Sequence, residues 1–178
     1  IRSLILKGED WGSFVPDAAL YDGAAIHTLS AAEKAILYRL RTMADEEFEA
    51  LPYGSEGLWR KLMHASRSCT TLEEIIAATK SKRYTRTRID RMILCAFLGI
   101  SREMLETPVP YTRVLALNDT GREVLKKARQ AGHFPNIGER IDHPYQALER
   151  RADDLYALCA PPPEKPGQTN HRRIFYTP

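Results

Sequence analysis

Six basic side chains gather in one short stretch of this chain. The string KSKRYTRTRIDR, residues 80–91, holds six lysines and arginines and one acid, whereas the whole 178-residue chain carries a net charge of only +3. Cations at this density bind phosphate groups, because their charge-assisted hydrogen bonds are strong and because binding releases counterions. A basic stretch with an aromatic ring inside it is typical of nucleic-acid binding, and the candidate contact residues are Lys80, Lys82, Arg83, Tyr84, Arg86, Arg88 and Arg91.

The same stretch runs into an amphipathic helix that we expect Thr85 to open. At 100° per residue, one side of that helix is apolar and predicts a buried face, whereas Arg88, Arg91 and Cys95 fall on nearly the opposite, solvent side. Cations at a helix start oppose the helix dipole by about 0.3–1 kcal/mol each, and a bound phosphate would reverse the sign. Tyr84 would either stack on a base or ribose or pack as a lid over the helix start. The apolar side consists of Ile89, Met92, Ile93, Ala96 and Phe97.

Three other interpretations of the basic stretch stay open. It could be a solvated helix start whose charge is compensated by Glu73 and Glu74. It could belong to a DNA-binding helix-turn-helix module formed by residues 71–80 and 85–98, with Arg88 near the start of the recognition helix. It could also be a protein-interaction surface that docks onto an acidic partner.

Recognisable catalytic motifs are missing from the sequence. No GxGxxG, GxxxxGK[ST], HExxH or GxSxG string occurs, and the five histidines lack metal-ligand spacing, so we predict no metal site. Asp153 and Asp154 are adjacent on a predicted helix and point apart, which favours solvated charges or partners of Arg150 and Arg151 over a carboxylate pair. The three scattered cysteines and the lack of a long apolar run predict a cytoplasmic chain with no disulfide framework and no membrane contact.

Helix-capping signals divide the first part of the chain. Ser30 with Glu33 forms an expected capping box for a long helix through Leu51, and Thr71 with Glu74 forms another for the helix that follows. Ser55 is the expected cap of a helix over residues 55–69. A further short helix is expected to begin at Ser101.

The second part of the chain changes character after Pro110. Residues 111–118 read as a strand, 119–132 as a helix and 133–138 as a second short strand, before a final helix over 144–160. The predicted fold is therefore mainly α, a multi-helix domain with a small strand-helix-strand element near residues 111–138. We expect the end of an upstream domain's last helix and a connector at 1–28, a helical domain with the small α/β element at 29–160, and a Pro-rich polar tail, extended or poorly ordered, at 161–178.

The first residues, IRSLILKG, already follow a helical apolar pattern without a cap. This predicts a helix over residues 1–7 that is entered after its beginning, in a fragment cut from a longer protein.

Four strings, in this order, resemble the C-terminal half of the bacterial tRNA(Met) cytidine acetate ligases, a family of nucleotidyltransferase-type proteins. They are SEGLWRKL (55–62), KSKRYTRTRIDRMIL (80–94), RVLALNDTGREVLK (113–126) and ADDLYAL (152–158). The chain departs from the family pattern at Trp59, Arg60 and Lys61.

The resemblance implies a function. Such enzymes use ATP and acetate to form acetyl-adenylate and then acetylate N4 of the wobble cytidine of elongator tRNA(Met). The adenylation site would lie in a missing N-terminal nucleotidyltransferase domain with a HIGH-like motif, and Ile1–Arg2 would end the last motif of that domain. Arg2 would contact ATP only in the full-length protein. The chain itself would hold the tRNA anticodon stem-loop through a helical RNA-binding domain at 29–160, without cofactor and without catalysis. Its other partner would be its own missing N-terminal domain.

Overall fold

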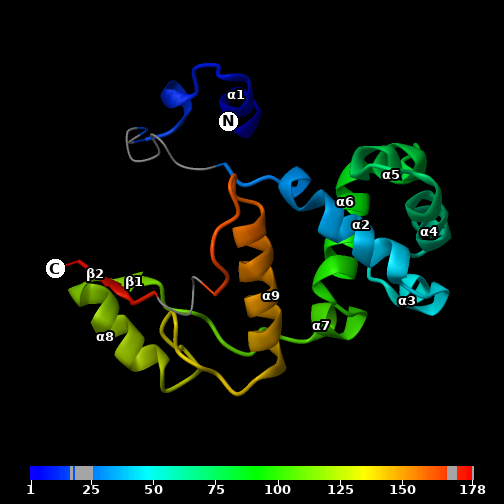
Figure 1. Cartoon of the computed structure of the whole chain (residues 1–178). Helices are drawn as coiled ribbons and strands as arrows, with labels where there is room; N and C mark the ends of the chain where they lie inside the picture. Colours follow the sequence, from blue (N-terminus) through cyan, green and yellow to red (C-terminus); the bar gives the residue numbers. More distant parts are fainter. Residues whose placement is uncertain (17, 19–25, 168–171, 178) are drawn as a thin grey trace.

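Five helices surround the main apolar core (Figure 1). They are α2 (Glu33–Thr42), α3 (Asp45–Ala50), α4 (Leu58–Ser68), α5 (Leu72–Thr79) and α6 (Arg86–Leu98). The computed structural model describes residues 1–16, 18, 26–167 and 172–177. Helix α6 packs against α2, α5 and α9 (Pro144–Leu158), so its apolar side is enclosed as the helical phasing predicts. The largest fully buried apolar side chains are Phe48, Ile36, Leu40, Leu58, Leu62, Ile75, Ile89 and Met92.

Several predicted helix ends are confirmed. The Thr71 hydroxyl accepts from the backbone N–H of Glu74, and the Glu74 carboxylate accepts from the backbone N–H of Thr71, which completes the capping box of α5. The Ser101 hydroxyl caps α7 (Arg102–Glu106) by accepting from the backbone N–H of Met104. Gly99 closes α6 with φ of 69°, a left-handed conformation that suits glycine.

The expected capping box of Ser30 and Glu33 is wrong. Ser30 lies inside a 3-10 turn, η3 (Leu29–Ala32), and its hydroxyl pairs with that of Thr28. The Glu33 carboxylate accepts instead from the backbone N–H of Leu72 at 2.7 Å, so it caps the start of α5. The long helix expected there is two helices, because Met43 and Ala44 adopt extended backbone between α2 and α3.

Ser55 does not cap α4 either. The N-cap position is Gly57, with φ of 83°, and α4 begins three residues after Ser55. The Ser55 hydroxyl accepts from the guanidinium of Arg88 at 2.8 Å. The predicted helix is therefore confirmed, but Ser55 contacts Arg88 and does not cap α4.

The α/β element lies apart from the helical core in Figure 1 and is only partly as predicted. Strand β1 (Ala116–Leu117) precedes α8 (Asp119–Ala128), and Val114 forms a parallel bridge with Asn136, so residues 111–138 do run strand, helix, bridge. The ladder partner of β1, however, is β2 (Phe175–Tyr176) in the polar tail, which pairs with it in parallel. The tail thus supplies the second strand at Phe175–Tyr176, whereas residues 166–167 form a turn.

The first segment forms α1 (Arg2–Lys7), which ends as predicted at Gly8 with φ of 70°. In Figure 1 it stands away from the helical core. Parts of the expected connector and tail lie outside the described residues, as does the side chain of Arg2, so its contact with ATP stays a prediction. Within the part of the chain that the structure describes, no helix has the length and apolar character to cross a membrane.

Candidate phosphate-binding surface

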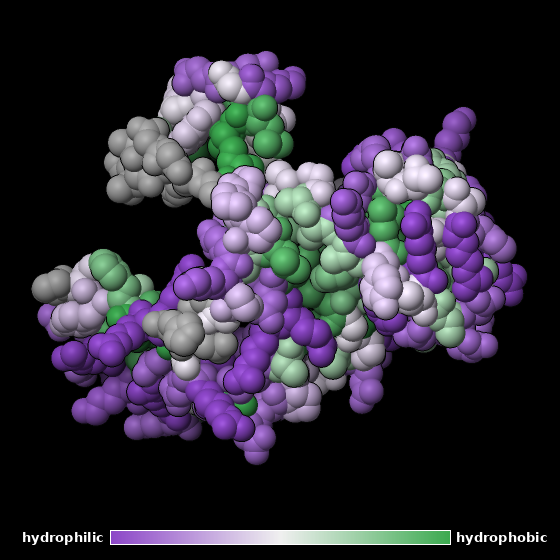
Figure 2. Space-filling model, viewed as in Figure 1, coloured by the Kyte–Doolittle hydropathy of each residue, from purple (hydrophilic) through white to green (hydrophobic). Residues whose placement is uncertain are grey.

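A tight turn between α5 and α6 presents the first cations to solvent. The backbone N–H groups of Ser81 and Tyr84 donate to each other's carbonyl oxygens, both at 3.2 Å, and the Ser81 hydroxyl also accepts from the N–H of Tyr84. This closed turn leaves Lys82 and Arg83 exposed at its tip. Hydrophilic side chains cover much of this side of the molecule, around α4 and α5, in Figure 2.

Tyr84 is the lid and not the stacking residue. Its side chain is 7% exposed, and its hydroxyl donates to the backbone carbonyl of Glu56 in the loop before α4. The Lys61 ammonium and the Arg88 guanidinium lie 5.9 and 5.6 Å from the centre of its ring. A ring enclosed in this way has no free face for a base, which corrects its assignment as a direct RNA contact.

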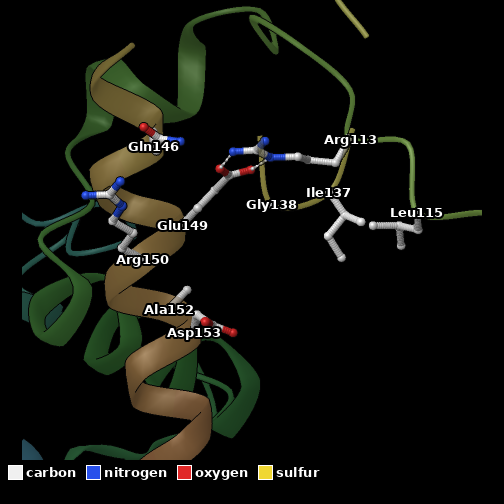
Figure 3. A pocket seen from close by; sticks show the side chains of 9 residues that line it. All are labelled: Arg113, Leu115, Ile137, Gly138, Gln146, Glu149, Arg150, Ala152 and Asp153. Carbon is white, nitrogen blue, oxygen red and sulfur yellow. Dashed lines mark hydrogen bonds and ion pairs between the residues drawn. The ribbon is translucent and has the colours of Figure 1, made fainter. Parts of the chain in front are cut away.

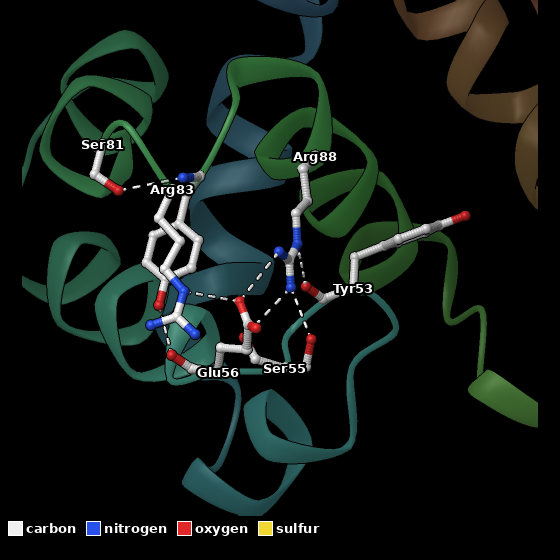
Figure 4. A network of polar contacts seen from close by, with 7 residues as sticks. Tyr53, Ser55, Glu56, Ser81, Arg83 and Arg88 are labelled. Atoms are coloured by element: carbon white, nitrogen blue, oxygen red, sulfur yellow. Dashed lines mark hydrogen bonds and ion pairs between the residues drawn. The ribbon is translucent and has the colours of Figure 1, made fainter.

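Three arginines of the predicted set are held by oxygen atoms of the protein itself, and Figure 4 shows two of them, Arg83 and Arg88. The Nε atom of Arg83 lies 2.9 Å from Oε2 of Glu56, within the network drawn there. Arg86 forms two hydrogen bonds, of 2.5 and 2.6 Å, with the carboxylate of Glu73. The third, Arg88, reaches back to the loop before α4 and donates to the carbonyl of Tyr53 at 2.9 Å.

These ion pairs affect the acids as well as the arginines. The hydrogen bond from Arg83 lowers the pKa of Glu56, and that from Arg86 lowers the pKa of Glu73, so both carboxylates stay ionised at neutral pH. Part of the charge of the stretch is therefore compensated within the chain, as the solvated interpretation expects for Glu73. Glu74 plays no such part, because its carboxylate is engaged in the cap of α5.

Arg88 and Arg91 do not stand together on an open face. Arg91 is exposed, whereas only 26% of the Arg88 side chain is exposed, because it turns toward the loop before α4. Cys95, expected on the solvent side with them, is 4% exposed, and burial raises the pKa of its thiol. Helical phasing places Cys95 on the solvent side, but neighbouring helices pack against α6 on more than one side and Cys95 is buried.

Five further cations, from α4, α6 and the segment between α5 and α6, form no ion pair within the described residues. Two of them, Arg60 and Lys61, come from α4, and the Arg60 guanidinium lies 4.9 Å from the centre of the Trp59 ring. The tie between Tyr84 and Glu56, with Lys61 over the Tyr84 ring, brings the start of α4 beside the turn, and no local pattern in the sequence signals this. We call the eight cations together the basic surface. The five without an ion pair are Arg60, Lys61, Lys80, Lys82 and Arg91; the three with one are Arg83, Arg86 and Arg88.

The packing of α6 weighs against a helix-turn-helix module. A recognition helix must place its first turn in the major groove. The first turn of α6 is instead tied down by Glu73 on α5 and by Tyr53 and Ser55 before α4. Freeing it would break contacts that join three elements.

A second polar site, which the sequence did not single out, lies between α9 and the segment after Tyr111 (Figure 3). Arg113 forms two hydrogen bonds with the carboxylate of Glu149, of 2.8 and 3.3 Å, and also donates to the carbonyl of Asn136 at 3.1 Å. The cavity beside this pair measures about 300 Å³ and is also lined by Asp153. Burial and the nearby Glu149 raise the pKa of Tyr111 to about 12.

Arg151 and Asp154 on α9 have other partners than the expected pairing between the acids and arginines of this helix. Arg151 donates to the carbonyl of Leu98 at 2.7 Å, and Asp154 accepts from the backbone N–H of Gly167. These two therefore hold neighbouring segments in place. Among the described residues, no group of three or more histidine, cysteine or acidic side chains is placed to bind a metal ion.

The similar proteins include members of the ligase family that the sequence resembles. Residues 1–171 match the family described as HIGH Nucleotidyl Transferase. The tRNA(Met) cytidine acetate ligase of Clostridium tetani is 37% identical over 117 residues, which cover 62% of this chain and 29% of that relative. The ligase of the same name from Listeria monocytogenes is 29% identical over 168 residues, covering 89% of this chain and 42% of that relative.

A solved structure shares the fold. The crystal structure of Thermotoga maritima TmcAL bound with alpha-thio ATP superposes with a TM-score of 0.77 and 20% identity, over 99% of this chain and 51% of that one. The chain thus spans half or less of the relatives it matches. Because residues 1–171 match the nucleotidyltransferase family itself, the expectation of a C-terminal domain that lacks the nucleotidyltransferase part is wrong.

Proposed function

We propose that this chain, which belongs to the HIGH nucleotidyltransferase family, is the part of a tRNA(Met) cytidine acetate ligase that holds the tRNA. The names of the similar ligases support the choice of RNA. One observation carries the role of this chain: the basic surface, which combines five cations without an ion pair in the described structure with three arginines that the chain holds in place. The tRNA-binding region would span residues 29–160, between a connector at 1–28 and a tail at 161–178.

The whole ligase would use ATP and acetate to form acetyl-adenylate and would transfer the acetyl group to N4 of the wobble cytidine, with release of AMP. This step requires an anticodon stem-loop held still while the reactive amine is presented. An anticodon stem-loop offers phosphates along its backbone and unpaired bases in its loop. The cations of the basic surface suit the phosphates, and each phosphate contact would make binding weaker as salt increases.

The ion pairs within the surface support this role. Arg83 and Arg88 are fixed by the loop before α4, so less side-chain freedom would be lost when a phosphate binds. A guanidinium has five N–H donors, and its carboxylate contacts leave others for a second anion. Lys82 and Arg91, both exposed and without a carboxylate partner in the described structure, would supply charge that no acid there pairs with.

Binding measurements test the proposal. We expect the chain to bind an anticodon stem-loop of tRNA(Met), with an affinity that falls steeply as the salt concentration rises from about 50 to about 200 mM. A DNA duplex of equal length is the matched competitor and should bind more weakly. Sequence-dependent preference for the duplex would instead support a DNA-binding module, and absence of binding to either would contradict the proposal.

The family description also raises a second role, the adenylation step itself. Residues 1–171 match this family, and the 178 residues contain no H-x-G-H string, so ATP binding by the chain decides whether it takes part in adenylation. Calorimetric titration with ATP and magnesium separates the two roles. Saturable binding of ATP to the chain, without binding of the stem-loop, would assign it to adenylation and overturn the tRNA-holding role.

A further inference from the structure

Tyr53 stands at the edge of the basic surface with its ring in solvent. It is 38% exposed, and Figure 4 shows its side chain projecting away from the polar network while its carbonyl faces Arg88. Within the described structure the ring has no aromatic neighbour, and its hydroxyl has no hydrogen-bond partner. Tyr53 thus exposes part of its aromatic ring at this edge, whereas the ring of Tyr84 is enclosed.

The backbone of Tyr53 is held in an unfavourable conformation. Its φ is 65°, and that of Glu56, three residues later, is 63°. Side chains with a Cβ atom avoid this left-handed region, which glycine occupies without penalty, and such residues gather where function requires them. A glycine would thus suit position 53 if only the turn mattered, so the tyrosine there indicates a use for the ring.

The contacts that fix this loop are the ones that build the basic surface. The carbonyl of Tyr53 accepts from Nε of Arg88 at 2.9 Å, and the carbonyl of Glu56 accepts from the hydroxyl of Tyr84. Arg83 holds the Glu56 carboxylate at 2.9 Å. The ring of Tyr53 is therefore presented at a set position beside cations that would bind phosphate.

We propose that Tyr53 is a stacking platform for an unpaired RNA base next to the phosphates held by the basic surface. The inference rests on the proposed function and adds a base-contacting residue to it. Unpaired bases stack on aromatic side chains whatever their sequence, and cations beside the ring hold the backbone that joins them. The ligand class is single-stranded or looped RNA, and a fully paired helix offers the ring no base face.

Substitution at position 53 tests the proposal, with the anticodon stem-loop as the probe. Tyr53→Ala should weaken binding about fivefold or more, the usual effect of losing one stacked base. Tyr53→Phe should bind like the parent, because the ring and not the hydroxyl makes the contact. Tyr53→Gly should also lose binding, with a thermal midpoint no lower than the parent, because glycine fits the left-handed backbone.

Two controls separate stacking from other causes. Tyr38→Ala removes a 73% exposed tyrosine on α2, outside the basic surface, and should leave binding unchanged. The salt dependence of Tyr53→Ala should equal that of the parent, because no charge is removed. A fully paired RNA of equal length should bind Tyr53→Ala and the parent alike.

The outcomes are distinct. Unchanged affinity of Tyr53→Ala for the stem-loop, in a chain that still binds RNA in a salt-dependent way, overturns the stacking role and leaves the proposed function standing. Equal losses for the stem-loop and the paired RNA also overturn it, because they indicate a general change of the surface. Failure of the parent to bind any RNA overturns the proposed function and this inference with it.

Discussion

The hydroxyl of Tyr84 donates to the backbone carbonyl of Glu56, and this one bond ties the α5–α6 turn to the loop that precedes α4. The two residues are 28 positions apart, and their contact brings Arg83 within reach of the Glu56 carboxylate. The basic surface is thus assembled by several contacts between residues distant in sequence, since Arg83 also holds Glu56 and Arg88 also holds the carbonyl of Tyr53, and no single one of these contacts carries it alone.

Removing that hydroxyl should lower stability but leave RNA binding nearly unchanged. Tyr84→Phe deletes one hydrogen bond and keeps the buried ring, so we expect the free energy of unfolding to fall by about 0.5–1.5 kcal/mol. Urea denaturation measures this. Stem-loop affinity should change by less than about twofold, within ordinary measurement scatter for an uninvolved site. A large loss of affinity at full stability would mean that Tyr84 contacts RNA after all.

The ion pair between Glu73 and Arg86 should restrain RNA binding. Glu73→Gln removes the carboxylate that engages the Arg86 guanidinium twice, so this guanidinium becomes available to phosphate. We expect stem-loop affinity to rise by about two- to fivefold, in line with the weakness of exposed pairs. Glu46→Gln, an exposed acid in the first turn of α3, is the charge-matched control. Equal gains in both variants would point to net charge alone.

The two predicted capping boxes should respond differently to mutation. Thr71→Ala removes a cap that exists and should lower the free energy of unfolding by about 0.5–2 kcal/mol. Ser30→Ala removes a hydroxyl that caps no helix and should change it by less than about 0.5 kcal/mol. Thermal or urea unfolding of the two variants checks this, and equal losses would contradict the assignment of the caps.

The local part of the fold could be predicted from the sequence. Helices α5, α6 and α7 begin or end where Thr71, Gly99 and Ser101 indicate, because capping depends on a few adjacent residues. The apolar side of α6 is buried as its spacing requires. The turn that presents Lys82 and Arg83 is equally local.

What could not be predicted depends on contacts distant in sequence. Glu33 has the spacing of a capping box with Ser30, yet its carboxylate serves Leu72, 39 residues away. Strand β1 pairs with the tail and not with the nearby segment that the β-α-β pattern favours. The residues around Arg88 do not indicate that it binds the carbonyl of Tyr53, 35 residues earlier. The sequence therefore does not mark Tyr53 as a candidate.

The salt dependence of stem-loop binding in the Lys82→Ala and Arg91→Ala double variant is the most direct test of the tRNA-holding role. Arg88 is left in place because its loss would disturb the loop before α4. Lys126→Ala with Lys127→Ala removes the same charge from the last turn of α8 and is the control. We predict that the slope of log affinity against log salt becomes shallower by roughly 1.5 in the first double variant, and stays unchanged in the control. A slope and affinity equal to those of the parent in the first variant, or an equal change in both, would contradict the basic surface as the tRNA-holding site.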